Sequence, residues 1–135
     1  MITPDINYWA IVVAVVISMA LGGVWYSNLL FAKAWLKGIG KTEAELKDGA
    51  VKGYITAIIA AAVTAYVLAH FVFYVGATTI IDGLQAGFWV WFGFFATTTA
   101  MHTAFERRSW NLFFIQAGYH LAQLLIIGAM LAVWQ

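Results

Sequence analysis

The sequence predicts an all-α integral membrane protein: a single domain, residues 1–135, that forms a bundle of four transmembrane helices joined by short loops. Of the 135 residues, 64% are hydrophobic and only 10% are charged, and the mean hydropathy is +0.86. A soluble domain carries about 25% charged residues, so most of this surface must face lipid. The few charged residues lie between long apolar runs, which is the pattern of a multi-pass membrane protein.

The first predicted span covers residues 8–31, which contain no charged residue. It exceeds the roughly 20 residues that a ~30 Å hydrocarbon core requires. Before it, Thr3, Pro4 and Asp5 combine a capping hydroxyl, a proline and a carboxylate, which suits the start of a helix. Small residues recur at every fourth position and would let another helix approach closely: Ala10, Ala14, Ser18 and Gly22.

A polar connector of residues 33–52 follows the first span. We expect Gly38 and Gly40 to end the first helix here. Thr42 and Glu45 have the spacing of a capping box, so a short surface helix is predicted to follow them.

Residues 54–74, 84–105 and 112–134 are the other predicted spans, and a polar hairpin of residues 106–111 joins the last two. The third span is rich in aromatic and hydroxyl side chains. The second has its own stripe of small residues: Ala57, Ala61, Ala65 and Ala69.

The basic residues predict an orientation. All 7 Lys and Arg residues lie in the 33–52 connector or the 106–111 hairpin, whereas the termini and the turn around Asp82 have none. The positive-inside rule places such segments in the cytoplasm. We therefore predict a multi-pass protein of the cell (inner) membrane, with its N-terminus and C-terminus outside.

Several function classes lose support from the composition. The net charge of +1 is too small to give the strongly basic surface that is typical of nucleic-acid-binding proteins. Cysteine is absent, and so are HExxH and glycine-rich phosphate motifs. His70 lies near the outer face, and the expected offset of about 6–8 Å between His102 and His120 along the membrane normal is poor for two axial haem ligands. We predict no catalytic motif, metal site or cofactor.

Polar residues concentrate in the predicted cytoplasmic half of the spans. Gln116, His120 and Gln123 share one helix face through their i, i+4, i+7 spacing. The candidate polar or ligand-binding cluster contains Tyr26, Ser27, Asn28, Thr98, His102, Glu106, Arg107, Gln116, His120 and Gln123. One interpretation is interhelical hydrogen bonding, because buried polar groups must be paired. The other is a small pocket open to the cytoplasm, with Arg107 or Arg108 at its mouth to bind an anion.

Two motifs carry a family resemblance. The end of the first span reads Trp25-Tyr26-Ser27-Asn28, Phe31-Ala32-Lys33 and Trp35. The last hairpin and span contain Phe105-Glu106-Arg107-Arg108-Ser109-Trp110 and Gly118-Tyr119-His120. These segments resemble uncharacterised bacterial four-helix integral membrane proteins, a domain of unknown function whose signature is Trp-Tyr-Ser-Pro, Phe-Gly-Lys and Trp. Asn28 stands in place of the usual proline, and Ala32 in place of glycine. The resemblance implies a four-helix fold and no particular activity.

Three functional hypotheses follow. The leading one is a protein that packs through its helices in the lipid bilayer, as a homo-oligomer or as a partner subunit of another membrane protein. Its rival is a small transporter or ligand-binding protein that uses the polar cluster. A membrane enzyme is the third, with Ser27 as nucleophile and His102 or His120 as base.

Overall fold

The computed structural model describes residues 2–135, which form an all-α fold. The π-helical segment η1 continues directly from α5 into α6, so residues 80–105 form one uninterrupted helical stretch. The helices in chain order are α1 (Tyr8–Trp25), α2 (Ala32–Ile39), α3 (Glu43–Lys47), α4 (Ala50–Tyr74), α5 (Ile80–Val90), η1 (Trp91–Ala96), α6 (Thr97–Phe105) and α7 (Trp110–Val133).

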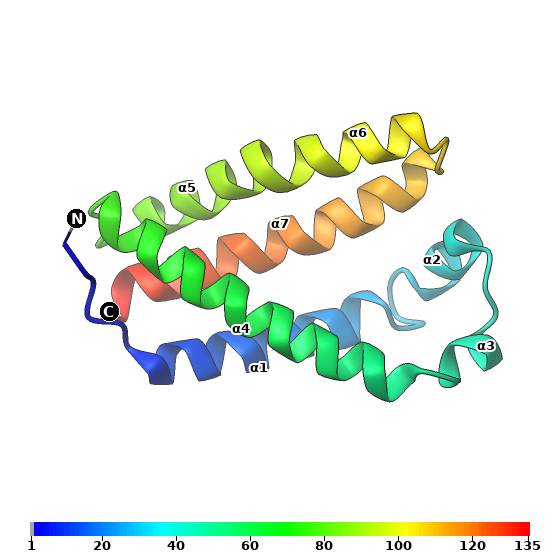
Figure 1. Cartoon of the computed structure of the whole chain (residues 1–135), viewed down its shortest axis with the longest axis horizontal. Helices are drawn as coiled ribbons and strands as arrows, with labels where there is room; N and C mark the ends of the chain where they lie inside the picture. The colour runs from blue at the N-terminus through cyan, green and yellow to red at the C-terminus, as the bar shows by residue number, and fades with distance from the viewer. Residues whose placement is uncertain (1) are drawn as a thin grey trace.

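The long helices run lengthwise (Figure 1). Both termini and the α4–α5 turn lie at one end of the molecule, and α2, α3 and the α6–α7 turn lie at the other. Helix α7 packs against α1, α2, α4, α5, η1 and α6, so it is the central element of the fold. All 7 basic residues belong to the end that carries α2, α3 and the α6–α7 turn.

Within residues 2–135, three helices are long and apolar enough to cross a membrane: α1, α4 and α7. Their outward faces carry large apolar side chains, such as Val16 and Ile59, which are 62% and 59% exposed. Such side chains are stable only where lipid, rather than water, surrounds them. The structure therefore indicates a multi-pass membrane protein. The 80–105 stretch is divided by its π-helical segment and is not one of the three long α-helices.

The first helix is shorter than predicted at both ends. It starts at Asn7, not at Thr3-Pro4-Asp5, because Asn7 Oδ1 accepts hydrogen bonds from the amides of Trp9 (3.1 Å) and Ala10 (3.2 Å). It ends at Trp25 instead of continuing to residue 31. The Ser27 hydroxyl donates to the Val24 carbonyl at 2.7 Å and accepts from the Leu29 amide at 3.2 Å. A serine that bonds the backbone locally in this way competes with helix continuation.

The connector contains an unpredicted helix, α2, besides the predicted α3. Gly40 ends α2 in the left-handed region at φ 67°, whereas Gly38 lies inside α2 and faces Leu112 of α7. The expected capping box is confirmed. The Thr42 amide donates to Glu45 Oε2 at 2.9 Å, and the Glu45 amide donates to Thr42 Oγ1 at 3.3 Å.

Small residues of the α1 and α4 stripes are buried inside the bundle. Ala10, Ala14 and Ser18 are fully buried, and Ala65 on α4 is also 0% exposed. Leu68, Val72 and Ile127 complete the core toward the end that carries the termini. The stripes do not stay packed along their whole length, because Ala57 is exposed.

Helices α5 and α7 make the closest backbone approach. A Cβ atom added to Gly83 would lie 2.7 Å from the Ala129 Cα atom, and one added to Gly87 would lie 2.7 Å from the Leu124 carbonyl carbon. Gly128 faces Gly83 from the other side. These glycines let the two helix backbones touch, which is how small residues pack helices in membranes.

Candidate functional site

The predicted polar cluster is distributed over three places in the structure. His120 and Gln123 of α7 join a buried hydrogen-bond chain. Tyr26 lines a cavity at the end of α1. His102 and Glu106 lie on the exposed α6–α7 turn.

The buried chain connects α7 to α1. His120 Nδ1 lies 3.0 Å from Gln123 Oε1, Gln123 Nε2 donates to Ser18 Oγ at 3.0 Å, and Ser18 Oγ donates to the Ala14 carbonyl at 2.7 Å. A carbonyl can only accept, so the single hydroxyl proton of Ser18 points at Ala14. Ser18 must then accept from the Gln123 amide group, and Gln123 Oε1 must accept from Nδ1–H of His120. The chain therefore selects the Nδ1–H tautomer of neutral His120.

Aromatic rings lead from this chain to the end of α1. The Tyr119 hydroxyl donates to the Ser18 carbonyl at 3.0 Å, which holds its ring against α1. The Tyr119 ring centroid lies 5.6 Å from that of Tyr26, and Tyr26 lies 5.0 Å from Trp35 of α2. The end of α1, the nearby helix α2 and the distant helix α7 thus supply one row of rings.

These rings border a cavity of about 610 Å³ between α1, α4 and the α2–α3 connector. The volume is within the roughly 300–1,000 Å³ that is typical of small-molecule sites. Several lining residues, including Asp48 and Tyr54, are exposed, so the cavity opens to the surface. The lining residues are Ser18, Met19, Gly22, Gly23, Tyr26, Trp35, Leu46, Asp48, Gly49, Ala50, Gly53, Tyr54, Ala57 and Tyr119.

Glycines keep this cavity open. A Cβ atom added at Gly23, Gly49 or Gly53 would meet nothing within 4 Å, so each lacks a side chain where space is available. The early end of α1 at Trp25 has the same effect, because the chain leaves the helix there and α2 packs against α7. The cavity is therefore a consequence of local sequence features at three separate positions along the chain.

The α6–α7 turn carries a surface ion-pair cluster instead of a pocket. His102 Nδ1 lies 3.2 Å from Glu106 Oε1, and Arg108 Nε pairs with the other oxygen of the same carboxylate. These side chains are about half exposed, so the pairs contribute only about 0–1 kcal/mol to stability. Arg107 is exposed, with φ 53°. Neither arginine lines the 610 Å³ cavity, so the expected basic mouth is not found there.

The remaining predicted residues do not converge on the cavity either. The Thr98 hydroxyl donates to the Phe94 carbonyl of its own helix at 2.8 Å, and Asn28 is exposed. Gln116 is half-buried on α7. The Ser27 hydroxyl is directed to Val24, so it is not paired with a histidine base.

Several residues that define the hydrogen-bond chain and the cavity were not predicted from the sequence. Ser18 was assigned to the packing stripe, although its hydroxyl is the centre of the hydrogen-bond chain. Trp35 and Asp48 belong to the polar connector, for which only a short surface helix was predicted. The alternation of Trp35, Leu36 and Ile39 with Lys33 and Lys37 was the available signal, because it marks a helix with one apolar face.

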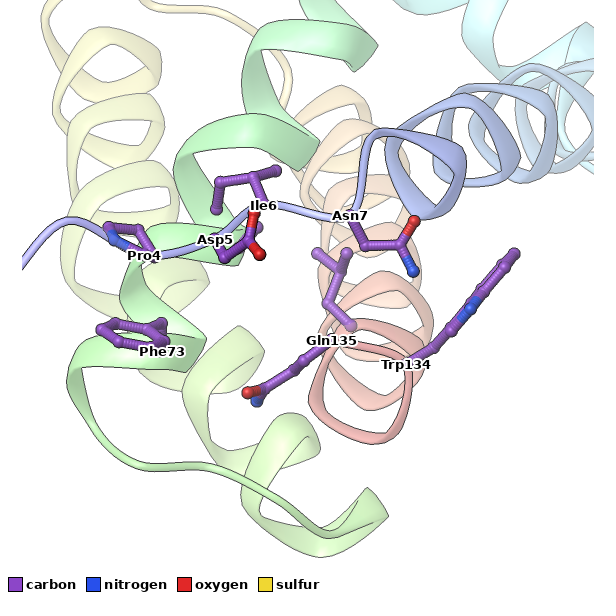
Figure 2. A pocket seen from close by; sticks show the side chains of 9 residues that line it. Pro4, Asp5, Ile6, Asn7, Phe73, Trp134 and Gln135 are labelled. Carbon is purple, nitrogen blue, oxygen red and sulfur yellow. The ribbon is translucent and has the colours of Figure 1, made fainter.

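Two further cavities are less suited to a ligand. One, near the termini, has a volume of about 20 Å³, room for about one water molecule. Figure 2 shows around it residues that precede α1, Phe73 of α4, and Trp134 and Gln135, which follow α7. The other, about 360 Å³ between α4 and α5, contains Asp82. The Asp82 carboxylate caps α5, and its hydrogen bonds with the Thr79 side chain and the Thr78 and Thr79 amides lower its pKa.

No group of three or more His, Cys, Asp or Glu side chains within residues 2–135 has a geometry that could hold a metal ion. His70 is separate from the other histidines, and its Nδ1 lies 2.8 Å from the Tyr66 carbonyl of its own helix.

Comparison with known proteins identifies one family. The model of the family described as "Protein of unknown function (DUF1761)" matches residues 9–132, which is most of the chain. This match confirms the resemblance to a family of unknown function that the motifs at residues 25–35 and 105–120 indicated. No curated protein and no solved structure matches the chain.

Proposed function

The chain belongs to the DUF1761 family, and we propose that it is a membrane protein that binds a small amphiphilic molecule in the cavity between α1, α4 and the α2–α3 connector. One observation carries this proposal: a cavity of about 610 Å³ that combines aromatic walls, glycines and a single carboxylate. Ligand sites are typically apolar concavities with a few polar groups. The hydrogen-bonded His120 chain supports the site, because it fixes the Tyr119 ring that forms one wall.

The proposal includes four membrane spans and an orientation in the inner membrane. Residues 84–105 of the 80–105 helical stretch would be the third span, since at ~1.5 Å per residue they extend about 33 Å, enough for a ~30 Å core. The 7 basic residues at one end favour a cytoplasmic position for α2, α3 and the α6–α7 turn. The cavity would then lie in the cytoplasmic half, with both termini outside.

Cysteine labelling tests this orientation, because the chain has no cysteine of its own. Glu43→Cys on α3 should react with a membrane-impermeant maleimide only after the membrane is opened. Thr78→Cys in the α4–α5 turn should react in intact cells. The reverse pattern would contradict the orientation and leave the cavity unaffected.

Photolabelling tests ligand binding. Benzophenone is a neutral aromatic probe that attacks methionine C–H bonds on illumination, and Met19 lines the cavity. Labelling of Met19 in detergent micelles should saturate with probe concentration. Met101 on α6 is 51% exposed and outside the cavity, so its labelling should rise linearly.

A matched pair of variants makes this test specific. Gly53→Leu fills the cavity from α4 and should abolish saturable labelling of Met19. Ala60→Leu adds a larger side chain at an exposed position of α4 that does not line the cavity, and it should leave labelling unchanged. If Met19 labelling is linear, or survives Gly53→Leu, the proposed function is wrong.

Oligomerisation or service as a partner subunit is the alternative function. The small-residue stripes that motivated it are largely used within the chain, since Ala10, Ala14 and Ser18 are buried in its interior. The structure therefore gives this alternative less support than the cavity gives to ligand binding. Light scattering of the purified protein measures it directly: a mass of two or more chains supports it, and a monomer contradicts it.

A further inference from the structure

We propose that the cavity selects an organic cation, such as a quaternary ammonium or phosphonium group with apolar substituents. This inference rests on the proposed function, because it names the ligand class for the same cavity. It follows from three properties of the lining: the arrangement of the rings, the sign of the only charge, and the apolar remainder.

Aromatic rings from α1, α2 and α7 line the cavity. Tyr26 lies between Trp35 and Tyr119, with centroid distances of 5.0 Å and 5.6 Å and interplanar angles of 56° and 55°. The three rings are thus tilted against one another rather than stacked, and all three line the cavity. Trp and Tyr faces attract a cation within about 6 Å of the ring centroid, and quaternary ammonium groups are recognised in this way. Tyr54 of α4 lines the same cavity.

Asp48 is the only charged residue that lines the cavity. It follows α3 and makes no ion pair with any residue of the 2–135 range. No Lys, Arg or His lines the cavity, so an anionic ligand would meet a carboxylate with no compensating side chain. The lysines of the connector are exposed and do not line the cavity. Salt therefore screens their attraction for an anion in the cavity.

The helix ends at the cavity do not reverse this preference. The C-terminal end of α1 contributes Gly22 and Gly23, and the N-terminal end of α4 contributes Gly49 and Ala50. The first carries a partial negative charge and the second a partial positive charge. Because these two charges have opposite sign, the Asp48 carboxylate remains the dominant charge.

The rest of the lining suits hydrocarbon. Met19, Leu46 and Ala57 are apolar, and the glycines add no polar side chain to the lining. A strongly hydrated inorganic cation would lose its water without gaining oxygen ligands here, because only one carboxylate is present. An organic cation with apolar substituents loses little hydration and can fill the volume.

Competition against benzophenone at Met19 tests the inference with ligands of matched shape. Tetraphenylphosphonium, triphenylphosphine oxide and tetraphenylborate present similar aryl groups with positive, zero and negative charge. In uncharged maltoside micelles, tetraphenylphosphonium should protect Met19 at a concentration at least tenfold lower than either of the others. Protection should be saturable and should weaken with rising salt.

Two variants identify the groups responsible. Asp48→Asn should raise the protecting concentration of tetraphenylphosphonium about fivefold, the size of a partly exposed charge pair. Glu43→Gln, on the same short helix but outside the cavity, should leave it unchanged. Trp35→Leu should weaken protection by the cation about fivefold, the size of one cation–π contact, and should affect triphenylphosphine oxide less.

The outcomes separate this inference from the proposed function. If all three compounds protect Met19 equally, or Asp48→Asn has no effect, the cation inference is wrong and ligand binding stands. If Met19 is saturably labelled but no compound protects it, the cation inference also fails alone. If Met19 labelling never saturates, both fail together.

Discussion

The glycine contact between α5 and α7 yields the sharpest prediction of stability. In Gly87→Ala the new Cβ atom would lie 2.7 Å from the Leu124 carbonyl carbon and 3.2 Å from the Leu125 amide nitrogen. These neighbours are backbone atoms of α7, so no side chain can rotate away. Helix α5 must separate from α7, and overpacking of this kind costs about 1–3 kcal/mol.

An opposing term must be subtracted from that cost. Alanine is favoured over glycine in a helix interior by about 0.5–1 kcal/mol. The net loss in the free energy of unfolding should therefore be about 1–2 kcal/mol, towards the upper end because the contact is made only of backbone. Gly53→Ala is the matched control. Its Cβ atom meets nothing within 4 Å, so it should stabilise the protein by about 0.5–1 kcal/mol.

Reversible unfolding in mixed micelles of a maltoside and dodecyl sulfate, followed by circular dichroism, measures both variants. The reasoning requires opposite signs for the two substitutions. If Gly87→Ala stabilised the protein as Gly53→Ala does, the close approach of α5 and α7 would be refuted.

Three further substitutions test individual contacts. Gln123→Leu should lower the free energy of unfolding by about 1–3 kcal/mol, because it leaves His120 and Ser18 without their partner; the same titration in dodecyl sulfate measures it. Trp25→Phe removes an indole N–H that donates to an α7 carbonyl at 2.9 Å, and a loss of about 1 kcal/mol is expected by that assay. The capping hydrogen bonds lower the pKa of Asp82 in the folded state, so their stabilisation is complete above its unfolded pKa of about 3.9 and disappears as pH falls through the folded value. An acid titration followed by the backbone amide signals of the α5 cap should show this loss in the wild type and not in Asp82→Asn, and equal titration of both would contradict the assignment.

Some features that depend on residues close together in the sequence were predicted correctly, whereas features that depend on contacts between distant segments were not. Thr42 and Glu45 were predicted correctly as a capping box because a capping box is read from residues three apart. The end of α1 was misplaced because an uncharged run does not show where a backbone turns. The hydroxyl of Ser27 bonds the local backbone there, and helix α2 begins a few residues later.

The candidate site shows the same division. His120 and Gln123 were predicted on one helix face, and they are hydrogen-bonded to each other through that short spacing. Their partner Ser18 lies far away in the chain, on α1, so no spacing could identify it. Asp48 and Trp35 reach the cavity only because the connector brings both of them to the end of the molecule where α1 ends and α4 begins.

The sequence by itself determined the all-α class, the lipid environment, the grouping of basic residues and the family. Each of these depends on composition or on neighbours within a few residues, and long apolar runs in lipid satisfy their backbone hydrogen bonds as helices whatever their packing. Only the tertiary structure decided where the polar residues meet. Hydrogen bonds between α1 and α7, and a cavity between α1, α4 and the connector, arise from contacts between distant segments. The stretch around Trp25 is therefore important for its position in the fold. Helix α1 ends there, and the candidate site lies at that end.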